Sequence, residues 1–589
     1  MECKTGKEVW EKLIQLFEVS DQIKENQEEQ KALMAAESKG KWADSDSVDS
    51  SSNDSNDKVE TYFTAKKESE VFDLSFDDFT QDDLIAALND MVIKYRKLSK
   101  SLNQTMSKIF VLSVAVSLLV VIVTLFLFRK QNLVDPAADP PHSRLPPGTS
   151  GWPFIGETLD YLHKLRNGNL REFVLHRVKK YESNVFTTSI IGHPIAMLCG
   201  PEGNKLLFSN ENKLVNIWFP ETIERIFAKS HGKPVGDDFA HVRNILRTYL
   251  MPSALQKHVG TIDSVTKLEL EEQWKPNKPA IVHDLAGRYA LGVVCRLFLG
   301  SNDPSMIEKL EKPEKDISHG IVSMPINIPG TTFNRALKAA RKLTALLVEV
   351  IKQRKIDLAT GKACRTQDIL SEMVNANDGN GDLLKETDIA AHLIGLIHGG
   401  YDPVRSGLTF IVKYMAELPE VYDQVFKEQM EVKNSKEENE ALNWEDMKKM
   451  KYSWNVIQEV FRLMPPVLGT FRRAIKDFTF GNHTIPKGYK IHWTAYYTHR
   501  DPKYFPNPEK FDPSRFDGIG PPPYSYVPFG GGPRMCPGIE YAKMVTLIFM
   551  HNIVTKYKWE LLVLDEKVVV DHHPRPTQGL PVRLRPHQS

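Results

Sequence analysis

The sequence predicts a mainly helical protein, in which one membrane-spanning segment precedes a single large globular body. Residues 109–128 have no charge, and as a helix this run is long enough to cross the hydrocarbon core of a bilayer. Between residues 386 and 417, apolar side chains recur at the spacing of one face of a long helix. A further helical segment, 459–464, ends at the proline pair that begins with Pro465, because proline cannot continue a helix.

Length, charge and cysteine usage exclude several classes of protein. The chain has 589 residues and a formal net charge of +1, so its overall charge does not indicate a nucleic-acid-binding protein. The five cysteines are odd in number and show no paired spacing, which argues against a disulfide framework and favours a reducing compartment. They are Cys3, Cys199, Cys295, Cys364 and Cys536.

Residues 1–108 form a leader that differs in kind from the rest of the chain. Lys7–Glu25 is an amphipathic helical segment, and the acidic, serine-rich residues 44–57 should be disordered. A capping box at Thr80 then opens a second amphipathic helix. The two helical blocks resemble plant retrotransposon gag polypeptides, although the accompanying zinc knuckle is absent. We interpret this acidic, partly disordered leader as a fused or mispredicted reading frame without a biochemical role.

A membrane anchor and a hinge follow the leader. Lys108 and Arg129 bound the uncharged run of 109–128, which favours a transmembrane helix over a buried core helix. Basic residues stand on both sides of this run, so the positive-inside rule does not decide which side the body occupies. Residues 129–156 are a proline-rich hinge, which should be stiff and should orient the body. The body itself occupies residues 157–589.

A cysteine in a glycine-rich loop is the most informative feature of the body. The pattern F-x-x-G-x-R-x-C-x-G is formed by Phe529, Gly532, Arg534, Cys536 and Gly538. A thiolate that binds a heme iron needs a sharp turn, which glycine permits, and a cation facing the heme propionates, for which arginine is suited. It also needs an apolar group that keeps water off the sulfur. The alternative is an ordinary surface loop with a free cysteine, and five matched positions argue against it.

This loop resembles the heme-binding loop of cytochrome P450, the family of heme-thiolate monooxygenases. The similarity to the family covers nearly all of residues 144–589. The resemblance implies a mainly α fold with small β-sheets, a heme b group (iron protoporphyrin IX) and Cys536 as the axial ligand of its iron. It further implies O2 as a co-substrate and electrons supplied by an NADPH–cytochrome P450 reductase.

The resemblance also assigns roles to five charged residues. Glu459 and Arg462 lie three residues apart on one helix, which alone is typical of an exposed ion pair. In the family, such a pair forms a buried structural triad with a downstream arginine, here Arg515. Two further matched segments imply that Arg243 and Arg472 contact the heme propionates. A lone arginine is otherwise more often a solvated surface charge.

A second resemblance concerns the substrate and rests on residues 211–220, 325–336, 410–417, 528–538 and 540–543. These segments resemble the plant subgroup of the family that oxidises triterpenes, best known for β-amyrin oxidases. The family's layout places Trp218 and Phe219 in a loop that borders the substrate. It places Val467 and Leu468 toward the heme face. Bulky apolar linings suit a large hydrocarbon, which binds mainly through the area removed from water; the alternative is that these side chains are ordinary core.

The predicted long helix departs from the family pattern at its centre. The pattern (A/G)-G-x-(D/E)-T is here Gly399-Gly400-Tyr401-Asp402-Pro403. The two glycines would leave space for dioxygen above the iron, and Asp402 retains the acid. Pro403 has no hydroxyl to assist proton delivery. The helix is expected to be locally opened at this point.

The predicted function is insertion of one oxygen atom into a C–H bond of a triterpenoid or another sterol-like terpenoid. The resemblance places the chain in the endoplasmic reticulum membrane as a single-pass protein in contact with lipid, its catalytic body in the cytosol. Two alternatives are a heme-thiolate isomerase or dehydratase, and an oxygenase weakened by Pro403. A third is a gag-like interaction module fused to an inactive heme domain. The mixed acidic composition of residues 1–108 makes a nucleic-acid partner unexpected.

Overall fold

The computed structural model describes most of the chain from residue 145 to residue 587, together with seven positions between 113 and 121. The chain divides into two units, Met1–Ser107 and Lys108–Ser589, and all described residues belong to the second. The predicted leader and most of the predicted membrane span lie outside the described residues, and no helix among the described residues is long and apolar enough to cross a membrane. Between 145 and 587, the residues outside the description are 153–154, 191, 228–243, 277, 378–380, 382, 439 and 571.

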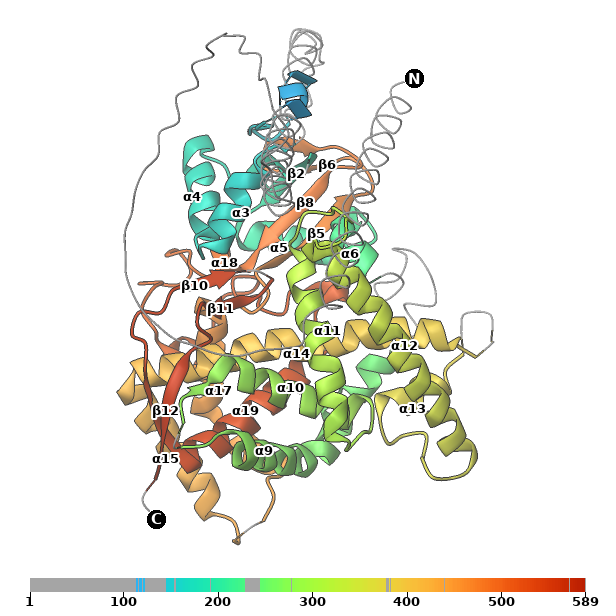
Figure 1. The fold of residues 1–589 in the computed structure, drawn as a ribbon. Coiled ribbons are helices and arrows are strands. Elements are labelled where there is room, and N and C mark those ends of the chain that lie inside the picture. The colour runs from blue at the N-terminus through green and yellow to red at the C-terminus, as the bar shows by residue number, and fades with distance from the viewer. Residues whose placement is uncertain are drawn as a thin grey trace, which may run out of the picture. The chain divides into compact units, whose positions relative to one another are not determined.

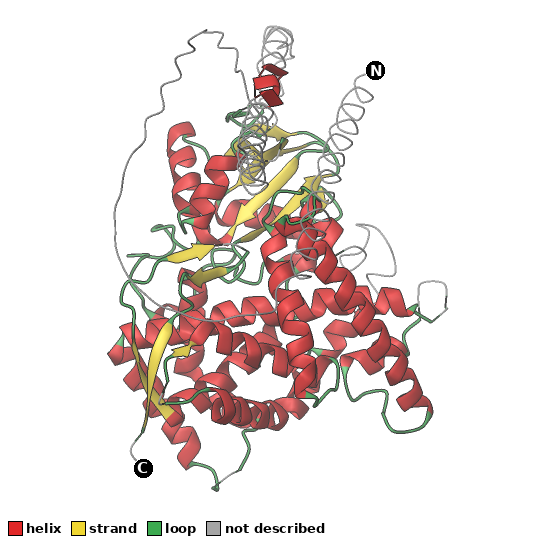
Figure 2. Ribbon diagram, viewed as in Figure 1, coloured by secondary structure: helices red, strands yellow, loops and turns green. Residues whose placement is uncertain are grey.

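Helices form the larger part of the second unit, and the strands gather into small sheets, which confirms the predicted fold class for the described residues (Figures 1 and 2). The predicted helix from 386 to 417 is α14 (Glu386–Glu417), and the predicted helix before Pro465 is α17 (Lys451–Leu463). The other helices are α3 (Thr158–Arg166), α4 (Leu170–Tyr181), α5 (Gly200–Ser209), α6 (Glu221–Ile226), α8 (Pro252–Leu255), α9 (Val259–Gln273), α10 (Val282–Phe298), α11 (Pro304–Ile321), α12 (Thr332–Ala359), α13 (Ile369–Val374), α15 (Pro419–Asn434), α16 (Trp444–Lys449), α18 (Ala495–Thr498) and α19 (Ile539–Lys556), with the 3-10 turns η2 (Gln256–His258), η3 (Pro513–Phe516) and η4 (Gly532–Arg534).

The strands form one five-stranded sheet and three smaller ones. They are β1 (Val185–Ile190), β2 (His193–Leu198), β3 (Val215–Ile217), β4 (Ala280–Ile281), β5 (Gly469–Ala474), β6 (Phe478–Phe480), β7 (His483–Ile485), β8 (Lys490–Thr494), β9 (Tyr557–Leu561), β10 (Val568–Val570), β11 (Pro574–Pro576) and β12 (Pro581–Pro586). The main sheet has the order β1-β2-β8-β5-β3, and the smaller sheets are β4-β12-β9, β6-β7 and β10-β11. In the main sheet only β2 and β8 are parallel neighbours. Pairing of Ile217 with Arg472 places β3 beside β5.

Helix α14 is buried along most of its length and positions the candidate site. Ile389, Leu393 and Ile397, whose spacing predicted the helix, are fully buried. A helix that is apolar on most of its faces must be surrounded by other elements, and α14 packs against α10, α12, α17 and α19. Figure 1 shows α14 crossing the helical part of the unit. Of its central residues, Gly400, Tyr401 and Asp402 are buried, whereas Pro403 is partly exposed and Gly399 is exposed.

Side-chain hydrogen bonds cap the N-termini of α11, α12 and α13. Asp303 accepts a hydrogen bond from the backbone N–H of Ser305 and begins α11, while Thr331 begins α12 in the same way. Asp368 caps α13 and also forms a buried ion pair with Arg354 of α12. This shared carboxylate joins α12 and α13.

The last part of the predicted hinge is attached to the main sheet. The N–H of Thr187 in β1 donates to the carbonyl of Pro147 at 2.8 Å, and the N–H of Glu157 donates to the carbonyl of Ser189 at 2.7 Å. Pro146 is buried. The described end of the hinge is therefore held by backbone hydrogen bonds to β1.

Candidate functional site

The loop around Cys536 runs from η4 into the start of α19. The N–H of Cys536 donates to the carbonyl of Phe529 at 3.0 Å, and the N–H of Gly538 donates to the Cys536 sulfur at 3.4 Å. Cys536 is exposed and lies just before the N-terminus of α19, where negative charge is favoured. An exposed sulfur that accepts an N–H bond at such a position suits a metal-binding thiolate.

A glycine lets this loop lie directly against α5. Gly532 has a φ of +65°, and a Cβ at this position would lie 2.0 Å from the carbonyl oxygen of Phe208. Any side chain would push the loop away from α5, so packing gives Gly532 a structural role beside the predicted one. Gly538 has a φ of −92°, which any residue adopts, and a Cβ there would lie 3.7 Å from the Cys536 sulfur.

Phe529 links the loop to the middle of α14. Its ring meets Phe461 edge to face, with the ring centroids 6.0 Å apart. Phe461, on α17, packs in turn against Gly407 of α14, where a Cβ would lie 2.9 Å from the phenyl ring. Two aromatic rings therefore connect the cysteine loop with α14.

Arg472 and Arg534, both predicted to contact heme propionates, meet on one buried carboxylate. Nε of Arg472 donates to Oε2 of Glu211 at 2.7 Å, and Nε of Arg534 donates to Oε1 at 3.3 Å. Burial lowers the pKa of Arg472, Glu211 acts against this shift, and Arg534 adds to it. Two guanidiniums on one carboxylate leave a net positive charge, which suits an anionic ligand. Glu211 was not predicted as a site residue, and the third predicted propionate contact, Arg243, lies outside the described residues.

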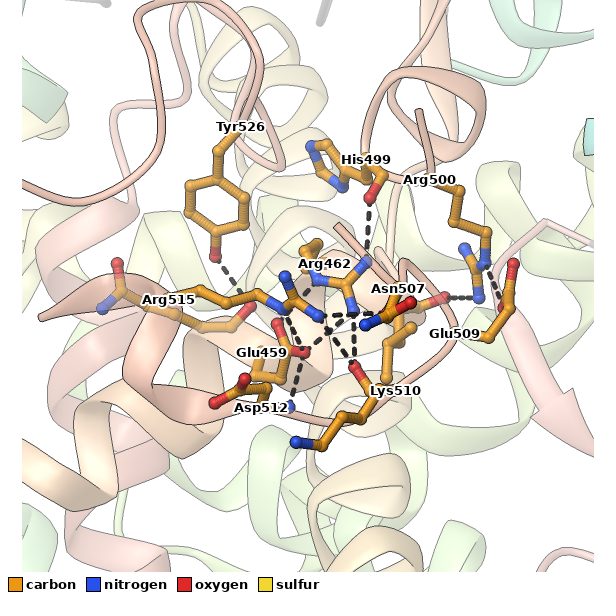
Figure 3. A network of polar contacts seen from close by, with 12 residues as sticks. Glu459, Arg462, His499, Arg500, Asn507, Glu509, Lys510, Asp512, Arg515 and Tyr526 are labelled. Atoms are coloured by element: carbon orange, nitrogen blue, oxygen red, sulfur yellow. Dashed lines mark hydrogen bonds and ion pairs between the residues drawn. The ribbon is translucent and has the colours of Figure 1, made fainter. Parts of the chain in front are cut away.

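Glu459, Arg462 and Arg515 come together as a buried ionic network (Figure 3). Nε and Nη2 of Arg462 donate to both oxygens of Glu459, at 2.7 and 2.8 Å, and Nε of Arg515 donates to Oε1 at 3.4 Å. Arg462 also donates to the carbonyls of His499 at 2.9 Å and Lys510 at 3.2 Å. The side chains of Arg462 and Glu459 are fully buried, so these bonds offset the cost of removing both charges from water.

The two central glycines of α14 have different surroundings. Gly399 has open space where its Cβ would lie, and it lines an apolar cavity. A Cβ at Gly400 would lie 2.9 Å from Val294 and 3.0 Å from Phe298 of α10. Gly400 therefore permits close packing of two helices, and of the two glycines only Gly399 lies beside open space; a role of either in binding dioxygen stays a prediction.

Pro403 does not interrupt α14. The helix runs from Glu386 to Glu417 with Pro403 inside it, so the predicted local opening at this point is wrong. Proline lacks the N–H that would bond to the carbonyl four residues earlier, and the packing of neighbouring helices around α14 maintains the helical path.

Asp402 lies on the side of α14 that faces a polar cavity of about 330 Å³. Its carboxylate lies 3.8 Å from Nη1 of Arg405 and 3.8 Å from Nε2 of His573. Burial acts to raise the pKa of Asp402, but the attraction of His573, His398 and Arg405 outweighs burial and holds the pKa below its usual value. Asp402 is therefore ionised at neutral pH and is reached from the polar cavity.

The apolar cavity, of about 340 Å³, contains three of the four predicted substrate residues in its lining. Phe219, Val467 and Leu468 line it. Trp218 does not; its ring packs edge to face against Phe471, with centroids 5.6 Å apart. Polar groups in the lining include His398, His492 and His572, which were not predicted as site residues. The adjacent pair His572-His573 is the one sequence feature that could have indicated a polar group here.

Comparisons with protein families, with curated proteins and with solved structures all match this chain to cytochrome P450 proteins. A family model of cytochrome P450 matches residues 146–583. A β-amyrin 28-monooxygenase of Saponaria officinalis, CYP716A378, is 50% identical over 447 residues, which are 76% of this chain and 92% of that protein. A β-amyrin 28-monooxygenase of Vitis vinifera is 49% identical over 444 residues, covering 75% of this chain and 92% of that protein.

Further relatives extend the similarity. A β-amyrin 16-beta-monooxygenase of Platycodon grandiflorus is 47% identical over 484 residues, covering 81% of this chain and 99% of that protein. Among solved structures, the retinoic acid-bound cyanobacterial CYP120A1 is 29% identical, with a TM-score of 0.68, and the match covers 75% of this chain and 99% of that chain.

Proposed function

The chain belongs to the cytochrome P450 family and is a P450 monooxygenase, and on that premise we propose that it oxidises a triterpenoid of the β-amyrin type. The observation that carries this proposal is the apolar cavity beside Gly399, because a large hydrocarbon binds mainly through apolar area removed from water. Position 28 of β-amyrin is the proposed site of oxidation, since the relatives from S. officinalis and V. vinifera are named for that position.

The residues of the cysteine loop fit the heme that the family implies. Cys536 would hold the iron through its exposed sulfur, and the Gly538 N–H would moderate the charge of the thiolate. Arg472 and Arg534, held by Glu211, would attract the propionates, and the resemblance supports the same role for Arg243. When bound, the heme supplies the activation of O2 and the transfer of oxygen.

The chain's own residues would position the substrate and supply protons. Phe219, Val467 and Leu468 would hold the hydrocarbon and exclude water from it. The ionised Asp402 carboxylate, which lines the polar cavity, would accept hydrogen bonds from water molecules that deliver protons toward Gly399. Such acid–base assistance typically raises a rate by about 100- to 10,000-fold, and Pro403 has no hydroxyl that could assist proton delivery. We therefore propose an oxygenase that couples electron use to product formation poorly.

The proposed setting of the enzyme follows from the family resemblance. Electrons would come from an NADPH–cytochrome P450 reductase. Residues 109–128 would anchor the chain in the endoplasmic reticulum membrane, with the body in the cytosol and residues 1–108 without a role in catalysis.

Product analysis tests this function. The full chain would be co-expressed in yeast with a β-amyrin synthase and a plant reductase, and products would be separated by gas chromatography and identified by mass spectrometry. The proposal predicts β-amyrin oxidised at position 28, and no such product from the Cys536→Ala variant. Oxidation at another carbon would reject the position. Absence of oxidised product from a heme-containing protein would reject the substrate class, and turnover without NADPH would favour an isomerase or dehydratase.

A further inference from the structure

Three histidines form a cluster at α14, in which two members are buried and the third, His572, is partly exposed. His398 belongs to α14, and His572 and His573 belong to the connection between β10 and β11. One ring nitrogen from each histidine lies within 4.8 Å of the corresponding nitrogens of the other two. The rings of His398 and His572 stack with centroids 5.5 Å apart, and those of His572 and His573 lie 4.2 Å apart.

Two of these histidines are oriented by hydrogen bonds to their other ring nitrogen. Nδ1 of His398 lies 3.1 Å from Oε2 of Glu314 on α11, and Nδ1 of His573 lies 2.6 Å from the carbonyl oxygen of Pro466. A carboxylate and a carbonyl both accept, so Nδ1 must donate in each case. Nε2 of each ring then presents a lone pair whenever the ring is uncharged, which is the state that binds a metal ion.

Those two Nε2 atoms are the second observation that points to a ligand. Among the described residues, Nε2 of His398 and Nε2 of His573 are buried nitrogens without a hydrogen-bond partner. Buried polar atoms are nearly always hydrogen-bonded, and leaving these two without a hydrogen bond costs free energy; His573 Nε2 faces the Asp402 carboxylate at 3.8 Å, which is too far for one. A bound group that accepts electron pairs from both nitrogens would remove that cost.

We propose that His398, His572 and His573 form a binding site for a divalent transition-metal ion of the zinc type. Metal-binding histidines generally donate their second N–H to a carboxylate or a carbonyl, as His398 and His573 do here. Zinc binds imidazole nitrogen at about 2.0–2.1 Å, and tetrahedral geometry then places the nitrogens about 3.3 Å apart, so the stacked rings of His398 and His572 must turn toward each other to close the site. The buried carboxylates of Glu314 and Asp402 supply the negative charge that a dication needs.

The site would leave one coordination position for an oxygen ligand. Three histidines with an open fourth position is the arrangement of reactive rather than purely structural zinc sites. His572 lines both the apolar and the polar cavity, so water or a substrate oxygen can approach from either. The site uses none of the residues proposed to hold heme.

Zinc content and coordination test the proposal directly. The full-length, heme-containing protein would be treated with a chelator, dialysed against Zn²⁺ and then against metal-free buffer, and analysed by elemental mass spectrometry. One zinc per chain is expected, with X-ray absorption showing imidazole ligands at about 2.0–2.1 Å. Failure of the wild-type protein to retain zinc, or coordination without imidazole, would overturn the proposal.

Variants locate the ion. His398→Gln and His573→Gln should abolish retention, and Glu314→Gln should weaken zinc affinity by about 10- to 100-fold, because it orients His398. His319→Gln is the matched control, since His319 lines the same polar cavity but is not in the cluster. The carbon monoxide spectrum of the heme checks that each variant is folded. Zinc retention that is equal in the wild type, His398→Gln and His573→Gln would place the ion elsewhere and contradict the proposal. If these two variants lose heme, the zinc affinity of Glu314→Gln and the X-ray absorption spectrum of the wild-type protein test the proposal instead.

Discussion

Nε of Arg472 donates to the carboxylate of Glu211 at 2.7 Å, and the same carboxylate accepts from Arg534. The bond joins β5 to the chain before β3, and the second bond joins both to the cysteine loop. A single acidic residue thus holds two arginines that we propose to face the heme propionates.

Removal of this carboxylate should weaken heme binding. In Glu211→Gln the two arginines would repel each other without a compensating charge, and breaking a buried ion pair in this way typically costs about 3–5 kcal/mol. Faster loss of heme to an acceptor protein, measured by absorbance, is expected. The control is Glu202→Gln, because Glu202 is an exposed acid on neighbouring α5. Equal rates of heme loss in the two variants would show that Glu211 does not position the arginines.

The two arginines of the buried triad should differ in importance. The Arg462 side chain is fully buried and makes two bonds to Glu459, whereas Arg515 makes one bond to Glu459, at 3.4 Å, and its side chain is 11% exposed. Arg462→Ala is therefore expected to destabilise the protein by about 3–5 kcal/mol, and Arg515→Ala by less. The midpoint of thermal unfolding and the yield of heme-containing protein measure this order. A larger loss in Arg515→Ala would contradict the assignment.

A threonine at position 403 should improve coupling. Pro403→Thr would supply the missing hydroxyl beside Asp402, so we expect more product per NADPH consumed and less peroxide. Pro403→Ala is the control, because alanine restores the backbone N–H without a hydroxyl and can itself stabilise the helix by up to about 3 kcal/mol. An equal gain in both variants would assign the effect to the backbone, and no gain in either would show that another group supplies the protons.

Stability should fall in acid because of a buried histidine. Burial lowers the pKa of His492 from 6.5 to about 4, so its ring is neutral in the folded protein at pH 7. Between these two values the unfolded chain binds a proton that the folded chain does not. The neutral His492 ring therefore contributes about 3 kcal/mol to the free energy of unfolding above pH 6.5, and this contribution is lost as the pH falls toward 4. The midpoint of thermal unfolding should decline less steeply with acid in His492→Gln, and an unchanged slope would count against this cause.

Periodicity in the sequence was sufficient to predict local helices, but it did not predict the contacts between distant segments. The apolar spacing from 386 to 417 predicted α14 with its observed bounds, and the prolines after Leu463 predicted the end of α17. Close packing of Gly400 against α10 was not predicted, because a glycine in a sequence does not reveal which helix lies beside it. Neither was the role of Glu211, which lies 261 residues from Arg472. The fold alone brings such pairs together.

The carbon monoxide spectrum of the reduced protein tests the central claim most directly, because every proposed role in oxygenation depends on Cys536 as the iron ligand. The wild-type protein should absorb at the wavelength characteristic of thiolate-bound heme, and Cys536→Ala should lose that band. Cys364→Ala is the control, since Cys364 is an exposed cysteine outside this loop. Survival of the band in Cys536→Ala would contradict the account.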